Sequence, residues 1–177
     1  MLVFALAATA LAQTPHSCVS PNAFSAQISE VSPTHGSLYG KYAYDFTNKR
    51  IWIREDIFET SHKTVHLEVI QLYEEKREYV IDLHTHKCTV YELNIPFIPA
   101  GIPQNATFLN TVSIGDSGIL GEGVNIDNWQ GAIPNVGEWM GSVTSKGCLP
   151  VSSQLFSKQF GYLLASFFDV ALGIVNP

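Results

Sequence analysis

Hydrophobic and polar residues alternate with a period of two along much of this chain, which is typical of half-buried β-strands. The clearest example is residues 40–55, Gly-Lys-Tyr-Ala-Tyr-Asp-Phe-Thr-Asn-Lys-Arg-Ile-Trp-Ile-Arg-Glu. Both halves are rich in aromatic and β-branched residues. Asp45 and Asn48 between them favour a turn, because their side chains bond to the local backbone. The pattern predicts a β-hairpin near the centre of a large antiparallel sheet.

The two faces of this hairpin are expected to differ. Tyr42 and Tyr44 lie on one face of the first strand, and Trp52 alternates with Ile51 and Ile53 in the second. We expect the aromatic side chains on one face and the isoleucines on the other. A sheet that is apolar on both faces must be covered on both, or must enclose something apolar.

The rest of the chain also favours strands. Apolar patterns predict them at residues 24–29, 65–73, 79–83, 88–93, 108–114 and 124–129, with a weaker candidate at 141–146. Residues 95–103 contain three prolines and a glycine, which predicts an irregular connection. Residues 153–168 suit a helix or a strand, and Gly161 together with the β context favours a strand. We expect a single domain over residues 13–177.

Residues 1–12 are almost wholly apolar and end in Ala10-Leu11-Ala12, a pattern typical of signal-peptidase cleavage. The stretch is shorter than the roughly 20 residues that a membrane-spanning helix needs. A buried N-terminal strand is the alternative. We expect a signal peptide and therefore a secreted protein without a transmembrane segment.

Composition narrows the classes of partner. The 177 residues are 46% hydrophobic and 15% charged, with a formal net charge of −6. These values favour a globular domain and are unlike the basic profile of a nucleic-acid-binding protein. No basic amphipathic helix predicts binding to an anionic membrane.

The cysteine count is odd, with Cys18, Cys88 and Cys148. In an oxidising compartment two would pair. The third would be free, bridged to another molecule, or paired with a cysteine beyond the end of this sequence. Asn105-Ala106-Thr107 is the only N-glycosylation sequon, and nearby Pro103 favours an exposed loop there.

Two motifs suggest chemistry, and each has a simpler explanation. Gly115-Asp116-Ser117-Gly118 is similar to the tetrad around the nucleophile of chymotrypsin-like proteases, but Ile119-Leu120 does not continue that pattern, and a turn explains the tetrad. A Ser117 hydrolase is therefore the weakest of our functional hypotheses. The second motif would bring together four potential zinc ligands if one strand ran unbroken: Asp82, His84, His86 and Cys88.

Against zinc, Thr85-His86-Lys87 is typical of a turn, a secreted cysteine is more often oxidised, and His62 and His66 add little. The carboxylates are scattered and form no calcium-binding loop. Solvated acids explain them, although an assembled surface site for calcium stays open.

The aromatic residues, 11% of the chain, are the more informative set. Core packing explains most of them, but a β-protein with two apolar sheet faces can also line a cavity for an apolar ligand. The candidate pocket residues are Tyr42, Tyr44, Trp52, Leu72, Trp129 and Phe168.

An ordered set of landmarks spans the mature chain. It comprises Cys18 with Pro21 and Phe24, Tyr44-Asp45, Arg50-Ile51, Leu72-Tyr73, Tyr79-Val80-Ile81-Asp82, Cys88, Ile102-Pro103-Gln104-Asn105-Ala106, Ile114-Gly115, Trp129, Cys148-Leu149-Pro150-Val151, Phe167-Phe168-Asp169, Gly173-Ile174 and Asn176-Pro177. The set resembles the ependymin family, including the ependymin-related proteins.

The resemblance implies a mainly β fold of two stacked, curled antiparallel sheets around a hydrophobic pocket, similar to bacterial lipoprotein carriers. It implies a secreted or lysosomal glycoprotein, often dimeric, that binds a lipid-like ligand and has no catalytic residues. The alternative function is a calcium-binding protein of the extracellular matrix or of cell–matrix adhesion, with calcium as a possible cofactor. The family pattern pairs Cys18 with Cys148, and Cys88 with a cysteine past Asn176-Pro177, so we expect a chain that is incomplete at its C-terminus.

Overall fold

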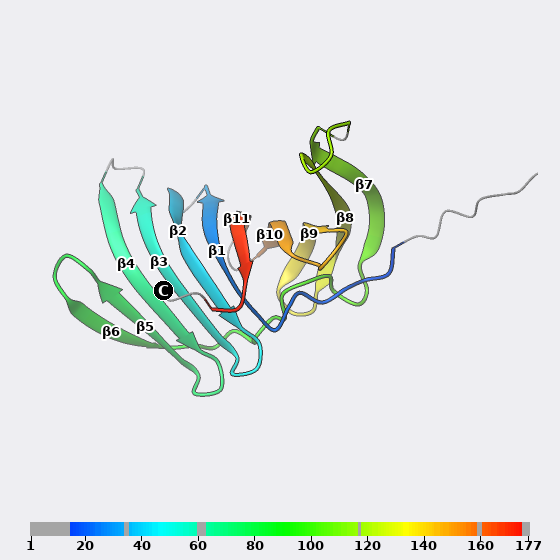
Figure 1. Ribbon diagram of the computed structural model, residues 1–177. Coiled ribbons are helices and arrows are strands. Elements are labelled where there is room, and N and C mark those ends of the chain that lie inside the picture. Colours follow the sequence, from blue (N-terminus) through cyan, green and yellow to red (C-terminus); the bar gives the residue numbers. More distant parts are fainter. Residues whose placement is uncertain (1–14, 34–35, 60–62, 117, 159–160, 175–177) are drawn as a thin grey trace, which may run out of the picture.

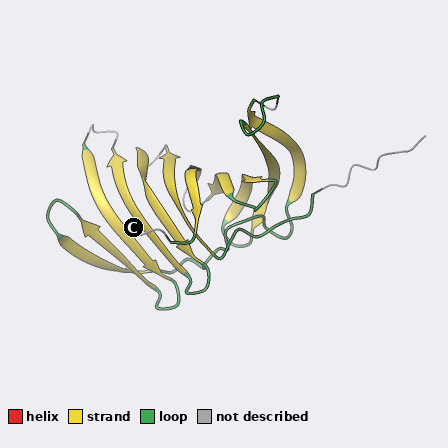
Figure 2. Cartoon of the chain, in the orientation of Figure 1, coloured by secondary structure: helices red, strands yellow, loops and turns green. Residues whose placement is uncertain are grey.

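The structure, a computed structural model, describes residues 15–33, 36–59, 63–116, 118–158 and 161–174. Within these residues all regular secondary structure is β (Figure 2). The strands, labelled in Figure 1, are β1 (Ala23–Ser32), β2 (Gly36–Asp45), β3 (Arg50–Phe58), β4 (Thr64–Leu72), β5 (Arg77–Asp82), β6 (Lys87–Glu92), β7 (Thr107–Gly115), β8 (Gly123–Ile133), β9 (Gly137–Thr144), β10 (Pro150–Ser157) and β11 (Gly161–Leu172). The signal peptide expected at residues 1–12 lies outside the described residues.

Three hairpins share one turn geometry, which accounts for the regularity of β2 to β6. The four-residue connections at 46–49, 73–76 and 83–86 each join a directly opposed pair of residues. Each ends on a residue with positive φ, namely Lys49, Lys76 and His86. In the first turn Asp45 Oδ1 accepts the Asn48 N–H at 3.0 Å, as the sequence predicted.

The strands form one continuous antiparallel sheet in the order β6-β5-β4-β3-β2-β1-β11-β10-β9-β8-β7. The first and last strands pair with each other inside the sheet, and the edge strands β6 and β7 are consecutive in the chain. The sheet curls without closing (Figure 1). The expected mainly β architecture of curled antiparallel strands is therefore confirmed, with both halves in a single hydrogen-bonded ladder.

The connection between β6 and β7 is also the cover of the sheet. Because these strands are opposite edges, the connection has to run from one edge of the sheet to the other. On its way Phe97 stacks on Tyr44, with ring centroids 5.7 Å apart, and Gly101 forms a bridge with Val19. We call the face that carries Tyr44 and packs against this connection the inner face, and the opposite one the outer face. The irregular segment predicted from its prolines thus lies against the body of the protein.

The register of the central hairpin corrects the expected distribution of side chains. Tyr42 lies opposite Ile53 and Tyr44 opposite Ile51, whereas Trp52 lies opposite Ala43. Directly opposed residues share a face, so the tyrosines and isoleucines are together on the inner face and Trp52 is on the outer face. The four-residue turn sets this register, and a shift by one residue would have exchanged the faces.

Two buried clusters hold the inner face together. One comprises Phe24, Ala26 and Tyr44, with Phe97 and Phe167 among the residues packed against it. The other consists of Ile102, Trp129, Trp139, Val143 and Cys148. The expected strand character of residues 153–168 is confirmed, and the structure divides this stretch between β10 and β11.

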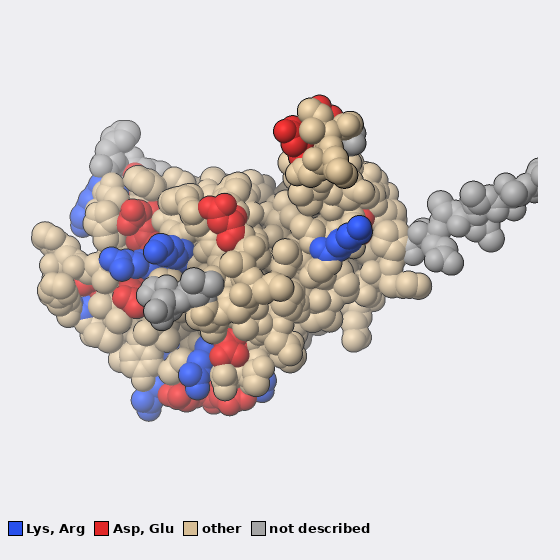
Figure 3. All heavy atoms as spheres, viewed as in Figure 1, with Lys and Arg blue, Asp and Glu red and all other residues tan. Residues whose placement is uncertain are grey.

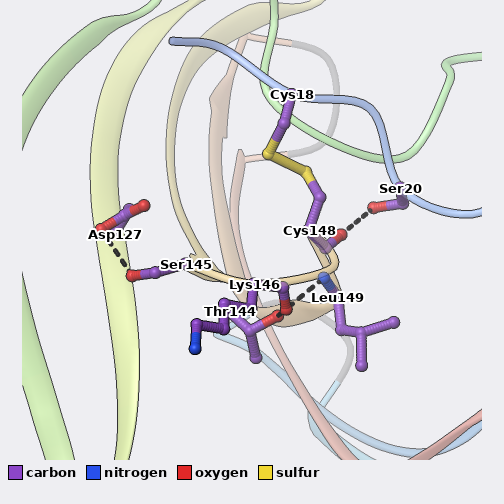
Figure 4. Close-up of a disulfide and its surroundings, with 8 residues drawn as sticks. All are labelled: Cys18, Ser20, Asp127, Thr144, Ser145, Lys146, Cys148 and Leu149. Atoms are coloured by element: carbon purple, nitrogen blue, oxygen red, sulfur yellow. Dashed lines mark hydrogen bonds between the residues drawn. A yellow bond between two sulfur atoms is a disulfide. The ribbon is translucent and has the colours of Figure 1, made fainter. Parts of the chain in front are cut away.

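The disulfide between Cys18 and Cys148 is present, with the Cα atoms 6.0 Å apart (Figure 4). It spans 130 residues of sequence. Beside it the Ser20 hydroxyl donates to the Cys148 carbonyl oxygen at 2.8 Å, and the Ile102 N–H donates to the Cys18 carbonyl oxygen at 2.8 Å. The bridge therefore joins the N-terminal segment and the covering connection to the turn that precedes β10.

Candidate functional site

A cavity of about 220 Å³ lies between the inner face and the covering connection. Strand β2 supplies Tyr42 and Tyr44 to its wall, and the connection supplies residues 98–101 and Pro103. The remaining wall comes from the other half of the sheet, with Ile133, Trp139, Ser142, Val143, Pro150, Ser152, Ser153, Leu155, Leu163, Ala165 and Phe167. Most of these side chains are apolar, which suits an apolar guest.

Tyr44 connects the sheet to the cover. Its side chain is 1% exposed, and its hydroxyl oxygen accepts the backbone N–H of Ala100 at 2.9 Å. Burial raises the pKa of the Tyr44 phenol. The phenol therefore stays neutral and keeps the hydrogen bond that holds this part of the connection over the cavity.

Tyr42 presents an aromatic wall rather than a titrating group. Its ring meets Phe167 edge-on at 5.6 Å and Phe24 at 5.8 Å. Burial, followed by the nearby Tyr73 and Tyr44 phenols, raises the pKa of Tyr42 far above its ordinary value. At physiological pH its neutral ring forms a continuous apolar surface with Phe167.

The opposite wall contains a polar anchor. The Trp139 indole N–H donates to the Ser153 hydroxyl at 3.0 Å, which fixes the ring while its carbon atoms line the cavity. Trp139 and Phe167 were absent from the candidate pocket residues. The sequence placed Trp139 only among the aromatic residues, because its place in the same cavity as the β2 tyrosines depends on pairing between distant strands.

The six candidate pocket residues are placed as follows. Tyr42 and Tyr44 lie in the cavity wall, and their role as ligand contacts stays a prediction. The other four do not line this cavity. Trp52 is on the outer face, where its N–H donates to Glu68 Oε1 at 2.7 Å, and Trp129 is packed in the cluster beneath the disulfide.

The remaining two are also on the outer face. Leu72 lies opposite Arg50 and Arg77, and Phe168 lies opposite Gln27 with 49% of its surface exposed. Their placement has one physical reason: alternation along a strand identifies which residues share a face, but not which face turns inward.

Carboxyl groups on the inner face are a feature that sequence analysis missed. Glu30 continues the buried alternation of Phe24, Ala26 and Ile28, and it lies opposite Ala165 of the cavity wall. Burial, with repulsion from Glu55, raises the pKa of Glu30 to about 7. The alternation of buried residues along β1 was the sequence signal that would have predicted Glu30 on the inner face.

The suggested zinc ligands are not brought together. Asp82 ends β5 and Cys88 lies in β6, and residues 83–86 turn between them. The Asp82 carboxylate accepts the N–H groups of His84 and Thr85, both at 2.8 Å, and these bonds lower its pKa. The zinc hypothesis was wrong because the strand does not continue. No group of three or more His, Cys, Asp or Glu side chains suited to a metal ion occurs among the described residues.

Three residues of the protease-like tetrad are described by the structure, and the first of them, Gly115, ends β7. Gly115 has a φ of 87°, and Asp116 Oδ1 accepts the Gly118 N–H at 2.7 Å. Ser117 and His62 lie outside the described residues. The hydrogen bond between Asp116 and Gly118 is of the kind that Asp makes in turns, and the interpretation of the whole tetrad stays a prediction.

Two other predicted positions are accessible. Asn105 is exposed in the turn that precedes β7, and Cys88 is exposed on the edge strand β6 with a free thiol. Within the described parts of the chain, no helix is long and apolar enough to cross a bilayer. Figure 3 shows acidic and basic side chains interspersed on a largely uncharged surface, without an extended basic patch in that view.

Comparisons with known proteins agree with this architecture. Residues 61–177 match the family model described as Ependymin. Relatives include Ependymin from Clupea harengus, with 28% identity covering 81% of this chain and 73% of the relative. Ependymin-1 from Oncorhynchus mykiss is 30% identical over 97% of this chain and 79% of its own length. Mammalian ependymin-related protein 1 from Rattus norvegicus is 29% identical over 93% of this chain and 73% of its own length.

Among solved structures, an uncharacterized conserved protein from Thermus thermophilus aligns with a TM-score of 0.50 at 4% sequence identity. The alignment covers 87% of this chain and 81% of that protein, and it shows similarity of fold alone. The family model covers well over half of the chain, and the relatives match most of its length. The chain belongs to the ependymin family.

Proposed function

We propose that this protein is a secreted, non-enzymatic binding protein that encloses a hydrophobic, lipid-like ligand in the cavity of its inner face. The observation that carries the proposal is the cavity of about 220 Å³, walled by aromatic and aliphatic side chains and covered by the connection between the two sheet edges. Ligand burial would contribute about 25 cal/mol per Å² of apolar surface, before the costs of association.

The shape of the cavity limits the ligand. Its volume is below the roughly 300–1,000 Å³ of pockets that bury a drug-sized molecule. A single narrow hydrocarbon chain therefore fits better than a fused-ring lipid. The few polar groups on the wall, such as the Ser153 hydroxyl, are already engaged by neighbouring side chains.

Native purification followed by organic extraction and mass spectrometry tests the proposal, together with titration of a neutral fluorescent fatty alcohol. The variant Ala165→Phe places a ring in the cavity wall, since Ala165 is 7% exposed and lines it. We expect it to weaken binding at least about tenfold, because the added side chain occupies the ligand's volume. Ala171→Phe, at an exposed position opposite Ser25, is the matched control and should bind normally.

If Ala165→Phe fails to fold, the smaller Ala165→Leu takes its place. Absence of any co-purifying lipid together with absence of fatty-alcohol binding by the unaltered protein would remove the proposal. Equal binding by the Ala165 and Ala171 variants would show that the ligand sits elsewhere.

The other properties implied by the family stay predictions. Glycosylation at Asn105 is supported by its exposure, and Asn105→Gln with a mobility shift tests it. Dimerisation is tested by light scattering, and calcium binding by calorimetry. For Cys88, mass mapping of the native disulfides tests whether the thiol is free or paired.

A further inference from the structure

A second hollow lies at one end of the sheet, where two hairpin turns meet the covering connection. Its volume is about 640 Å³, which is within the roughly 300–1,000 Å³ of small-molecule sites. Its lining residues come from the turns at 46–49 and 73–76 and from residues 93–97 and 99 of the connection. Figure 1 shows both turns at the same end of the sheet, beside the start of the connection. We call this hollow the turn cleft.

Backbone hydrogen bonds hold the walls of the turn cleft together. The Tyr73 N–H donates to the Lys49 carbonyl oxygen at 3.1 Å, which joins the two turns. The Leu93 N–H donates to the Lys76 carbonyl oxygen at 2.9 Å, which joins the second turn to the connection. These bonds fix the three segments relative to one another, so the cleft is formed before any ligand enters, as is usual for small-molecule sites.

Aromatic side chains supply the apolar part of the turn cleft. The Phe97 ring contacts those of Tyr73 and Phe46, with centroids 5.1 and 6.1 Å away. All three residues line the cleft, and Phe46 is 38% exposed although its side chain is large and apolar. The rings therefore offer a ligand an accessible apolar surface, whose burial would favour binding.

The charged residues of the turn cleft are mostly basic. Lys49 Nζ lies 3.2 Å from Glu74 Oε1, and both residues line the cleft. Lys76 lines it as well, and within the described residues its side chain makes no ion pair or hydrogen bond. Among the described residues that line the cleft, no others are acidic or basic. Two cations therefore stand against one carboxylate, in a chain whose formal net charge is −6.

We propose that the turn cleft is a second ligand site, separate from the cavity of the proposed function, and that it binds a small carboxylate with an apolar body. The body covers the rings of Phe46 and Phe97. The carboxylate accepts charge-assisted hydrogen bonds from Lys76 and, in competition with Glu74, from Lys49. An extended anionic surface such as a membrane is disfavoured, because the net charge of −6 opposes its approach.

The test compares three probes with the same aromatic body: naphthylacetate, naphthylethanol and naphthylethylamine. Amide chemical shifts of the full chain report each titration by NMR. At low ionic strength naphthylacetate should bind about fivefold more tightly than the neutral alcohol, as expected for partly exposed cations, and the amine more weakly than the alcohol. The largest shifts should occur at the amides of Lys76, Leu93 and Phe97. Equal affinity for acid and alcohol, or shifts confined to Leu155 and Leu163 of the first cavity, would overturn the assignment.

Charge variants in the turn cleft should act in opposite directions. Lys76→Gln should remove most of the preference for naphthylacetate and leave the affinity for naphthylethanol within about twofold. Glu74→Gln frees Lys49 from its ion pair and should strengthen naphthylacetate binding about two- to threefold, which a purely structural role of the turn would not produce. Lys87→Gln and Glu122→Gln are the matched controls, since both residues are exposed and neither lines the cleft. A preference that persists in Lys49→Gln/Lys76→Gln would refute the proposal.

Phe46→Ala tests the apolar part of the turn cleft. It should weaken naphthylacetate and naphthylethanol alike, by about three- to tenfold, because both probes lose the same apolar contact. Unchanged affinity for both would contradict the placement of the aromatic body. Co-sedimentation with vesicles of phosphatidylcholine and phosphatidylglycerol gives the remaining distinction. Vesicle binding that requires Lys49 and Lys76 would overturn the small carboxylate as the ligand, whereas its absence supports the proposal.

Discussion

Removal of the Cys18–Cys148 bridge is expected to destabilise the protein strongly. The bridge closes a loop with a sequence separation of 130 residues. The chain-entropy model gives about 5 kcal/mol for a loop of this length at room temperature, because the cross-link removes many conformations from the unfolded chain. This is comparable with the entire stability of an ordinary domain.

The bridge is also linked to the cover of the cavity. Cys148 is 6% exposed, its carbonyl oxygen accepts the Ser20 hydroxyl, and Ser20 N–H donates to the Ala100 carbonyl oxygen at 3.1 Å. Without the bridge, the N-terminal segment is held to the turn before β10 by few bonds. We therefore expect the amide of Ile102, which donates to the Cys18 carbonyl oxygen, to lose protection from hydrogen exchange.

The measurement is equilibrium unfolding in urea of Cys18→Ala/Cys148→Ala in a Cys88→Ser background, compared with Cys88→Ser alone. Replacing the free, exposed Cys88 in both proteins prevents disulfide exchange. The expected loss is about 3–5 kcal/mol, with a larger dependence on urea because the unfolded chain becomes more expanded. A loss below about 1 kcal/mol, with unchanged exchange at Ile102, would refute the assignment of the bridge as the main tether of the cover.

Three further predictions concern the inner face. Gly40→Ala should cost about 2–3 kcal/mol in urea unfolding, since a Cβ there would lie 2.1 Å from the Arg54 carbonyl oxygen; a neutral effect would contradict the close approach of β2 and β3. Tyr44→Phe removes the acceptor of the Ala100 N–H and should lower the free energy of unfolding by about 1–2 kcal/mol. An unchanged free energy of unfolding would contradict this role of the hydroxyl. Folding raises the pKa of Glu30 to about 7. The contribution of Glu30 to the free energy of unfolding is therefore most favourable below about pH 4.5 and is lost as the pH rises through 7. Glu30→Gln should therefore stabilise the protein by up to about 3 kcal/mol above pH 7 and have little effect near pH 4, and an equal effect at both pH values would refute the assignment.

The sequence by itself determined the strands, their turns and the family. Local alternation and turn chemistry act over a few residues, so the hairpin at residues 40–55 and the meander to residue 93 were readable directly. The pairing of Cys18 with Cys148 followed from the family pattern and is confirmed by the structure.

Only the tertiary structure decided which side chains face the cavity. The register of the turn at 46–49 moved Trp52 to the outer face and brought Tyr42 together with Ile53. Pairing of β1 with β11 then placed Glu30 beside Ala165, more than a hundred positions away in the chain. Alternation repeats every two residues and so carries no information on which face turns inward, and contacts between distant strands exist only once the whole sheet has formed.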